Sequence, residues 1–286
     1  MALRFDQVTY TYHSAGERQT GLDALDLMLA EGRFTAVLGA SGSGKSTLLQ
    51  HFNGILLPEA GRLHVLDYVL QPGISGKGLK ELRRRVGLVF QFPEQQLFAE
   101  TVEQDLMYGP LNFGADVQTA RRAARQAAAA LGLGEELLAK SPFHLSGGQM
   151  RKAAIATVLA ADPEVLVLDE PAATLDQASR EELLGLLAEL CRVRGKTVIL
   201  VTHRLEEVLP YADDYVLLAA GKTLFHGSPG ELLANAALME QAGIVTPPVV
   251  RFLRDFSQLF GAPFPPGPYT TERLAHYISQ TLGMPS

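Results

Sequence analysis

The chain has 286 residues, of which 47% are hydrophobic and 20% charged, a composition that excludes an intrinsically disordered protein. Its formal net charge is −6, so we expect no nucleic-acid partner, because such binding needs a basic surface that neutralises phosphates. A single cysteine excludes an intramolecular disulfide. No apolar stretch approaches the roughly 18–20 residues of a membrane-spanning helix, so we expect no span within this sequence.

The N-terminal third alternates short apolar runs with turn residues, a pattern typical of strands. A first strand through Val8, Tyr10 and Tyr12 places all three side chains on one face. Further strands are predicted at 25–32, 33–39, 62–70 and 86–90, and helices at 47–54 and 79–85. The second of these helices ends in Arg83–Arg85, which we expect to be solvated and without a ligand.

Residues 94–160 are rich in alanine and leucine and interrupt the strand pattern, which resumes afterwards. Helices are expected at 101–108, 116–132 and 147–161, strands at 165–170, 197–203 and 214–221, and a hairpin strand at 222–227. The simplest interpretation is an α/β fold, a mixed or parallel sheet with helices, interrupted by an inserted helical subdomain. A separate, small C-terminal helical region is predicted from residue 228 onward, with an amphipathic segment at 249–260.

The clearest motif follows the strand at 33–39 and opens the helix behind it. Gly39-Ala40-Ser41-Gly42-Ser43-Gly44-Lys45-Ser46 fits the pattern G-x-x-x-x-G-K-[ST]. Glycines let such a loop curl so that backbone N–H groups and the helix N-terminus face phosphate oxygens. We expect Lys45 to reach the β- and γ-phosphates, Ser46 to hold Mg²⁺, and Thr47 to touch an inner phosphate.

Two adjacent carboxylates end the buried strand at 165–168. Asp169 is expected to hold Mg²⁺ through water, and Glu170 to face the γ-phosphate and polarise an attacking water. Phosphoryl transfer needs mainly positioning and charge neutralisation, and the loop and this pair supply both. The sequence therefore predicts a nucleoside-triphosphate site.

The segment LSGGQ at 145–149 completes a set of motifs that resembles the ATP-binding cassette (ABC) ATPases over roughly residues 3–227. That resemblance implies a P-loop ABC ATPase core at 1–227 with a helical subdomain at about 94–160, using ATP and Mg²⁺. It also implies a dimer in which the signature loop of one subunit completes the nucleotide site of the other.

The same resemblance implies roles for further residues. Tyr12 matches the aromatic residue that stacks on adenine, with Tyr10 as an alternative, and Gln91 matches the glutamine that senses Mg²⁺ and the γ-phosphate. His203 matches the histidine that contacts the γ-phosphate, and Asp176 the aspartate that communicates across the dimer. The signature loop itself corresponds to Ser146, Gly147, Gly148 and Gln149.

Three segments, at 46–54, 91–114 and 141–156, resemble the ATPases of energy-coupling factor (ECF) transporters, which include cobalt and nickel importer relatives. Among them the chain is similar to the second of two paralogous ATPases in vitamin-type complexes. This implies uptake of a vitamin or transition-metal-type micronutrient at the cytoplasmic face of the cell membrane. The implied partners are a second ECF ATPase (a heterodimer, with a homodimer also possible), a membrane coupling (T) subunit and a substrate-binding membrane (S) subunit.

The resemblance gives two segments a role in assembly. Residues 228–286 correspond to a region that helps two ATPases associate. The segment after Gln91 corresponds to a short helix lining a groove for arginine-bearing helices of the coupling subunit. Its local acids, which are candidates for pairing with those arginines, are Glu94, Glu100, Glu103 and Asp105.

One departure from the family pattern and several alternative functions stay open at this point. Thr174 stands where the family usually has glycine, which predicts a stiffer loop before Asp176. The chain could instead be a regulatory nucleotide-binding module whose partner does most of the hydrolysis, or the ATPase of another ABC importer class. A soluble ABC protein of repair or translation and a P-loop kinase rank lower, because the chain has one phosphate loop and carries LSGGQ.

Overall fold

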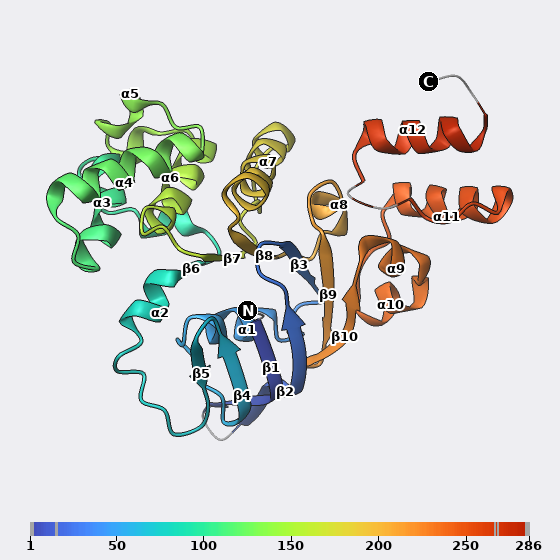
Figure 1. Ribbon diagram of the computed structural model, residues 1–286, viewed down its shortest axis with the longest axis horizontal. Coiled ribbons are helices and arrows are strands. Elements are labelled where there is room, and N and C mark those ends of the chain that lie inside the picture. Colours follow the sequence, from blue (N-terminus) through green and yellow to red (C-terminus); the bar gives the residue numbers. More distant parts are fainter. Residues whose placement is uncertain (1–2, 15–16, 266, 268, 284–286) are drawn as a thin grey trace.

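A computed structural model describes residues 3–14, 17–265, 267 and 269–283, so the ends of the two predicted regions, 1–2 and 284–286, lie outside it. A six-stranded sheet in the order β10-β9-β3-β8-β7-β6 forms the centre of the molecule (Figure 1). All neighbours in it are parallel except the β9–β10 hairpin, which confirms the predicted mixed α/β sheet. Its strands are β3 (Phe34–Leu38), β6 (Val86–Val89), β7 (Val165–Asp169), β8 (Thr197–Val201), β9 (Asp214–Ala219) and β10 (Lys222–Gly227).

A second, antiparallel sheet has the order β2-β1-β4-β5. Its strands are β1 (Leu3–Ser14), β2 (Glu17–Leu29), β4 (Ala60–Val65) and β5 (Tyr68–Leu70). Helix α1 (Lys45–Phe52) buries Leu48, Leu49 and Phe52 in the core that both sheets share. The single strand predicted at 62–70 was wrong: the chain turns at Leu66, whose φ is 54°, and pairs β4 with β5 as a hairpin.

The residues between β6 and β7 form the expected helical subdomain, on the left of Figure 1. It consists of η1 (Pro93–Gln96), α3 (Val102–Asn112), α4 (Val117–Ala130), α5 (Glu135–Leu138), η2 (Pro142–His144) and α6 (Gly147–Leu159). Thr101, Asp116 and Ser146 cap the three long helices by accepting backbone N–H groups, which stabilises each by about 1 kcal/mol. Alanines of α4 pack in the main core, so short side chains allow close helix packing.

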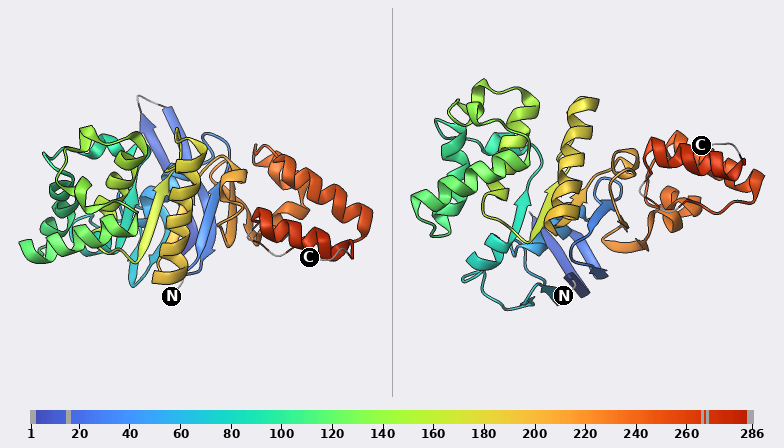
Figure 2. Two further views of the ribbon diagram at one scale, coloured as in Figure 1. Left: turned by 90° about the horizontal axis from the view of Figure 1, so that it is seen from above. Right: turned by 45° about the horizontal axis from the view of Figure 1, so that its top comes forward.

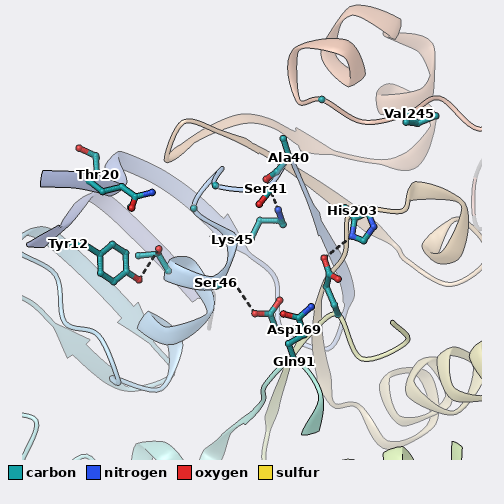
Figure 3. A pocket seen from close by; sticks show the side chains of 17 residues that line it. Tyr12, Thr20, Ala40, Ser41, Lys45, Ser46, Gln91, Asp169, His203 and Val245 are labelled. Atoms are coloured by element: carbon teal, nitrogen blue, oxygen red, sulfur yellow. Dashed lines mark hydrogen bonds and ion pairs between the residues drawn. The ribbon is translucent and has the colours of Figure 1, made fainter. Parts of the chain in front are cut away.

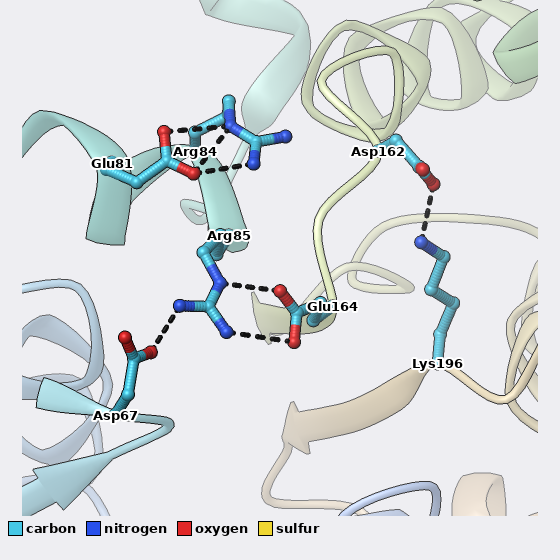
Figure 4. Close-up of polar contacts among 7 residues, drawn as sticks. All are labelled: Asp67, Glu81, Arg84, Arg85, Asp162, Glu164 and Lys196. Carbon is cyan, nitrogen blue, oxygen red and sulfur yellow. Dashed lines mark hydrogen bonds and ion pairs between the residues drawn. The ribbon is translucent and has the colours of Figure 1, made fainter.

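The arginines that end helix α2 (Lys80–Arg85) are engaged, which corrects the expectation that they are merely solvated (Figure 4). Arg84 pairs with Glu81 at 2.6 Å. Arg85 pairs with Glu164, just before β7, at 2.5 Å, and with Asp67 in the β4–β5 turn. Arg85 therefore ties the two sheets together, away from the phosphate loop.

In the part of the C-terminal region that the structure describes, four helices follow the hairpin β9–β10: α9 (Pro229–Ala234), α10 (Ala236–Gln241), α11 (Pro248–Phe260) and α12 (Thr271–Thr281). They lie together at one end of the molecule, opposite the helical subdomain (Figure 2). Their buried residues Leu232, Met239 and Leu253 belong to the same core as Tyr215 of β9, and Tyr269 donates its N–H to the carbonyl of Leu209 at 2.8 Å. The C-terminal region thus packs on the core of the central sheet.

Helices α7 (Gln177–Arg194) and α8 (Leu205–Val208) complete the fold: α7 stands between the helical subdomain and α8, and α8 lies on the side of the C-terminal helices (Figure 1). None of the helices in the described ranges is long and apolar enough to cross a bilayer.

Candidate active site

A cavity of about 660 Å³ lies where β3, β6, β7 and β8 of the central sheet end (Figure 3). These parallel strands present their carboxyl ends at one edge, which is where open α/β sheets bind ligands. The cavity gathers most of the residues predicted from sequence. These are Tyr12, Ala40, Ser41, Gly42, Gly44, Lys45, Ser46, Thr47, Gln91, Asp169, Glu170 and His203.

The phosphate loop curls between β3 and the N-terminus of α1. Gly44 precedes the helix with φ 104°, and a Cβ there would lie 2.4 Å from the carbonyl oxygen of Gly21, so only glycine fits. Lys45 Nζ donates to the carbonyl oxygens of Gly39 and Ala40 at 2.8 Å each. Burial lowers the pKa of Lys45, against the opposing charges of the nearby carboxylates. The loop thus folds around its own lysine.

Ser46 and Asp169 meet across the floor of the cavity. Ser46 Oγ donates to Asp169 Oδ2 at 3.0 Å, and Gln91, just after β6, lines the same space. Burial raises the pKa of Asp169, and the hydrogen bond from Ser46 opposes that shift. Hydroxyl, carboxylate and amide oxygens are the ligands that Mg²⁺ prefers, so these residues fit a magnesium ion.

Glu170 and His203 form a second polar pair, one residue further along β7 and at the end of β8. His203 Nδ1 lies 2.7 Å from Glu170 Oε1. Glu170 has φ 45°, an uncommon conformation for a non-glycine residue, and its N–H donates to the carbonyl of Val201 at 2.9 Å. The backbone is held in a costly geometry that turns this carboxylate into the cavity.

Tyr12 lies at the opposite end of the cavity from His203 (Figure 3). Its hydroxyl lies 3.1 Å from Thr47 Oγ1. Tyr10 packs edge-on against Tyr12, with ring centroids 5.0 Å apart, and does not line the cavity. Of the two tyrosines, Tyr12 is therefore the one that an adenine ring could reach, since its side chain is partly exposed.

Five predicted residues outside the phosphate loop do not line this cavity: Ser146, Gly147, Gly148 and Gln149 of the signature loop, and Asp176. Ser146 and Gln149 form a capping box at the start of α6, in which Ser146 Oγ accepts from Gln149 N at 3.3 Å. Asp176 caps α7 by accepting from Ser179 N at 3.0 Å, and such hydrogen bonds lower its pKa. Gly39 and Ser43 shape the phosphate loop without lining the cavity either.

Sequence analysis missed five lining residues. Gln19, Thr20 and Gly21 come from β2, opposite Tyr12 in the β1–β2 hairpin, where Tyr12 pairs with Gln19. The register of that hairpin would have indicated them. Gly243 and Val245 come from the C-terminal region, and no local sequence signal connects them to the phosphate loop.

Arg151 is a further residue that sequence analysis passed over. It lies in α6, is 1% exposed, and its guanidinium pairs with Glu94 at 2.9 Å. It also donates to the carbonyl of Ala173 at 3.2 Å and to Thr174 Oγ1 at 3.3 Å. Arg151 therefore connects the signature helix with the segments that follow both Gln91 and Glu170.

Comparison with known proteins identifies the family. The ABC transporter profile matches residues 22–173, more than half of the chain. An energy-coupling factor transporter ATP-binding protein, EcfA2 of Bacillus cereus, is 43% identical over 283 residues, covering 99% of this chain and 97% of its own. EcfA2 of Listeria innocua is 46% identical over 262 residues, covering 91% of each chain. The chain belongs to the ECF ATPases of the ABC transporter family.

Solved ABC structures agree with this assignment. CbiO1 of Clostridium perfringens, part of the ABC transporter complex CbiONQ, has a TM-score of 0.74 and 33% identity, covering 88% of this chain and 98% of its own. The cassette MJ0796, solved as a post-hydrolysis dimer with ADP and phosphate, has a TM-score of 0.71 and 27% identity, covering 80% and 98%. The predicted fold class and family are confirmed, and the ECF ATPase binds and hydrolyses ATP.

The four acids that the ECF resemblance singled out differ in what they touch. Asp105 is 3% exposed, and its carboxylate accepts from Phe98 N and Ala99 N at 3.2 Å, so the expectation that it is free for a partner is corrected. Glu94 is paired with Arg151, and Glu103 lies 3.4 Å from Arg121. Glu100 alone of these four is exposed without an ion pair in the described part of the chain.

Proposed function

We propose that this chain is an ATP-hydrolysing motor subunit of an energy-coupling factor importer, which powers uptake of a vitamin or transition-metal-type micronutrient through separate membrane subunits. The observation that carries the proposal is the cavity in which the phosphate loop faces Asp169, Glu170 and His203. Relatives named as ECF ATP-binding proteins match it along almost their whole length. We also propose that the chain divides into an ABC ATPase domain, residues 1–227, and a C-terminal region, residues 228–286, that helps two ATPases associate.

In the proposed reaction, Lys45 and the loop N–H groups hold the β- and γ-phosphates, and Tyr12 stacks on adenine. Ser46, Asp169 and Gln91 would hold Mg²⁺, which neutralises charge on the phosphates. Glu170 accepts a hydrogen bond from the attacking water and so orients the oxygen of that water towards the γ-phosphorus. His203, bonded to Glu170 at 2.7 Å, keeps that carboxylate in place and contacts the γ-phosphate.

A second ATPase subunit completes the site in this proposal. The signature residues of one chain lie outside its own cavity, while Ser146 and the α6 N-terminus present N–H groups that suit a phosphate. Two chains would bind two ATP molecules between them, close, hydrolyse and reopen. A heterodimer with a related paralogue is favoured by the resemblance to one of two paralogues, and a homodimer is the alternative.

A membrane coupling subunit would bind near the helical subdomain and hold the ATPase at the cytoplasmic face of the membrane, and a separate S subunit would select the solute. In support, a groove of about 510 Å³ lies between α2, β6, α3 and α6, lined by Ile55, Phe90 and Phe113 among others. In the same subdomain, the rings of Phe98 and Tyr108 pack edge to face and are 63% and 53% exposed. Exposed aromatic side chains of this kind are typical of protein interfaces.

The decisive experiment replaces the water-orienting carboxylate in the assembled importer. Glu170→Gln should lower ATP turnover by about a hundredfold or more while leaving ATP binding intact, because only the transition state needs that charge. Glu206→Gln, an exposed acid in α8, is the matched control. Turnover that stays at the wild-type rate in Glu170→Gln would overturn the motor assignment and favour a regulatory module.

A second experiment tests the coupling surface. Glu100→Arg should weaken capture of the coupling subunit while ATP binding stays unchanged, since Glu100 is the exposed acid beside Phe98. Glu136→Arg, an exposed acid of α5 in the same subdomain, is the control. Equal capture by both variants would remove Glu100 from the proposed interface.

A further inference from the structure

The C-terminal region returns to the phosphate loop. The N–H of Ala40 donates to the carbonyl oxygen of Ala242 at 3.0 Å. Ala242 is 2% exposed and follows α10 directly. One backbone hydrogen bond therefore joins the nucleotide-binding loop to a segment about 200 residues later in the chain.

The turn that makes this contact is anchored on both sides. Gly243 N donates to the carbonyl of Glu240 at 3.0 Å, and Ile244 N to that of Met239 at 2.8 Å. Met239 and Ile244 are buried in the main core. The turn is consequently fixed to the C-terminal helices, and its position follows theirs.

Glycine is required where the turn approaches the loop. Gly243 has φ +66°, and a Cβ at this position would lie 3.0 Å from the Cβ of Ala40, which is tighter than ordinary packing. Both the backbone conformation and the lack of room favour glycine. The close approach between turn and loop is thus built into the sequence.

The next residue, Val245, completes the wall of the cavity. It is 83% exposed and lines the cavity together with Gly243. Figure 3 places Val245 on the side of Ser41 and His203, far from Tyr12. An apolar side chain therefore stands at the end of the site where the terminal phosphates would lie.

The loop residue that the turn holds also positions the lysine. The carbonyl oxygen of Ala40 accepts from Lys45 Nζ at 2.8 Å and from Ser43 N at 3.2 Å. A shift of Ala40 would move the acceptors of the phosphate-binding ammonium group.

We propose that the turn 242–245 is part of the nucleotide site: it positions the phosphate loop through Ala40 and forms a rim at the triphosphate end through Val245. The placement of the C-terminal helices then sets the affinity of the chain for ATP. This rests on the proposed function of the cavity as the ATP site. Gly243 and Ala242 are positioning residues, since they act through the loop.

The rim is tested by changing charge at one position. Val245→Asp should weaken Mg²⁺–ATP binding to the full chain by about fivefold and Val245→Lys should tighten it by a similar factor, through repulsion and attraction of phosphate charge. The difference should shrink from ATP to ADP to AMP and with added salt. Equal ATP affinity of the Asp and Lys variants would show that Val245 does not lie close to the triphosphate.

The tie to Ala40 is tested with two matched glycines. Gly243→Ala and Gly261→Ala introduce the same side chain at φ +66° and +63°, but the Cβ at 261 meets no atom within 4 Å. Both should lower the free energy of unfolding through the same backbone strain, and Gly243→Ala should lower it further because its Cβ also presses on Ala40. ATP affinity should fall by about fivefold in Gly243→Ala only. Equal ATP affinity of the two variants would show that the turn 242–245 does not position the phosphate loop through Ala40.

Failure of this inference can be told apart from failure of the proposed function. Lys45→Ala, measured in the same assay, must weaken ATP binding by about a thousandfold if the cavity is the ATP site. If Lys45→Ala has this effect, the Val245 and Gly243 variants test the role of the turn alone. If it does not, the cavity is not the ATP site, and the proposed role of the turn fails with it.

Discussion

The phosphate-loop side and the signature side of this ATPase are organised in opposite ways. On the first side, polar groups are already joined across a cavity, Ser46 with Asp169 and Glu170 with His203. On the second side, Ser146 and Gln149 form a reciprocal capping box at the start of α6 and line no part of that cavity. The chain therefore holds the phosphate-loop half of the proposed catalytic centre within one cavity, and in the proposed dimer the signature loop would complete the site of the partner.

Lys45→Ala should give the largest effect and act on the chain by itself. Removing the ammonium group from the loop should weaken ATP binding by about a thousandfold, because charge-assisted contacts to phosphate supply much of the affinity. Equilibrium binding of a fluorescent ATP analogue measures it. Lys196→Ala, which removes an ion pair with Asp162 far from the cavity, should bind ATP normally; equal binding by both variants contradicts the comparison.

Ser146→Arg should leave ATP binding by the isolated chain unchanged and lower turnover of the assembled complex by about a thousandfold. A bulky cation at the α6 N-terminus removes the cap and opposes the helix dipole where a partner's phosphate would sit. Thr270→Arg removes a comparable hydroxyl cap from α12 and controls for lost stability. Turnover at the control's rate would mean that the signature loop has no role in catalysis.

A buried histidine in the last turn of α1 helps to stabilise the phosphate-loop side. His51 is fully buried beside Tyr10, and burial lowers its pKa to about 4. The unfolded chain takes up this proton near pH 6.5, so the stabilisation is complete above that pH and is lost as the pH falls toward 4. Neutral His51 thus contributes about 3 kcal/mol to the free energy of unfolding above pH 6.5, and about 2 kcal/mol of this contribution should be lost at pH 5.

Urea unfolding at pH 7 and pH 5 measures this loss for the wild type and for His51→Gln. The glutamine can donate to the carbonyl of Thr47, which the His51 ring contacts at 2.7 Å, but cannot be protonated in this range. The variant should lose about 2 kcal/mol less than the wild type between the two pH values. An identical pH dependence would mean that other groups control acid stability.

Local patterns predicted the phosphate-loop side well, because its strand, glycine-rich turn and helix are consecutive in sequence. They failed where leucine takes a conformation typical of glycine, as at Leu66, which adopts φ 54° in the β4–β5 turn. They also failed where burial decides a role: Asp105 looks like the acids around it, yet its carboxylate holds two backbone N–H groups inside the subdomain. The contact of Ala242 with Ala40 depends on packing of distant segments, which no local pattern encodes.

Thr174 lies where the two sides meet and gives the smallest expected effect. It has φ 67°, a conformation that suits the glycine usual in this family, and its hydroxyl accepts from buried Arg151 at 3.3 Å. Thr174→Gly should raise the free energy of unfolding by about 1 kcal/mol, because it removes backbone strain while Arg151 keeps its bonds to Glu94 and Ala173.

Thr174→Ala separates the two contributions, since it removes the hydroxyl and keeps the strained Cβ. It should lower the free energy of unfolding by about 1 kcal/mol, the value of one hydrogen bond, so the Gly and Ala variants should differ by about 2 kcal/mol in urea unfolding. Equal stability of the two would show that the loop bears no strain. Because Arg151 belongs to the signature helix and Thr174 follows Glu170, a faster or slower turnover in the glycine variant alone would mean that loop stiffness links the two sides.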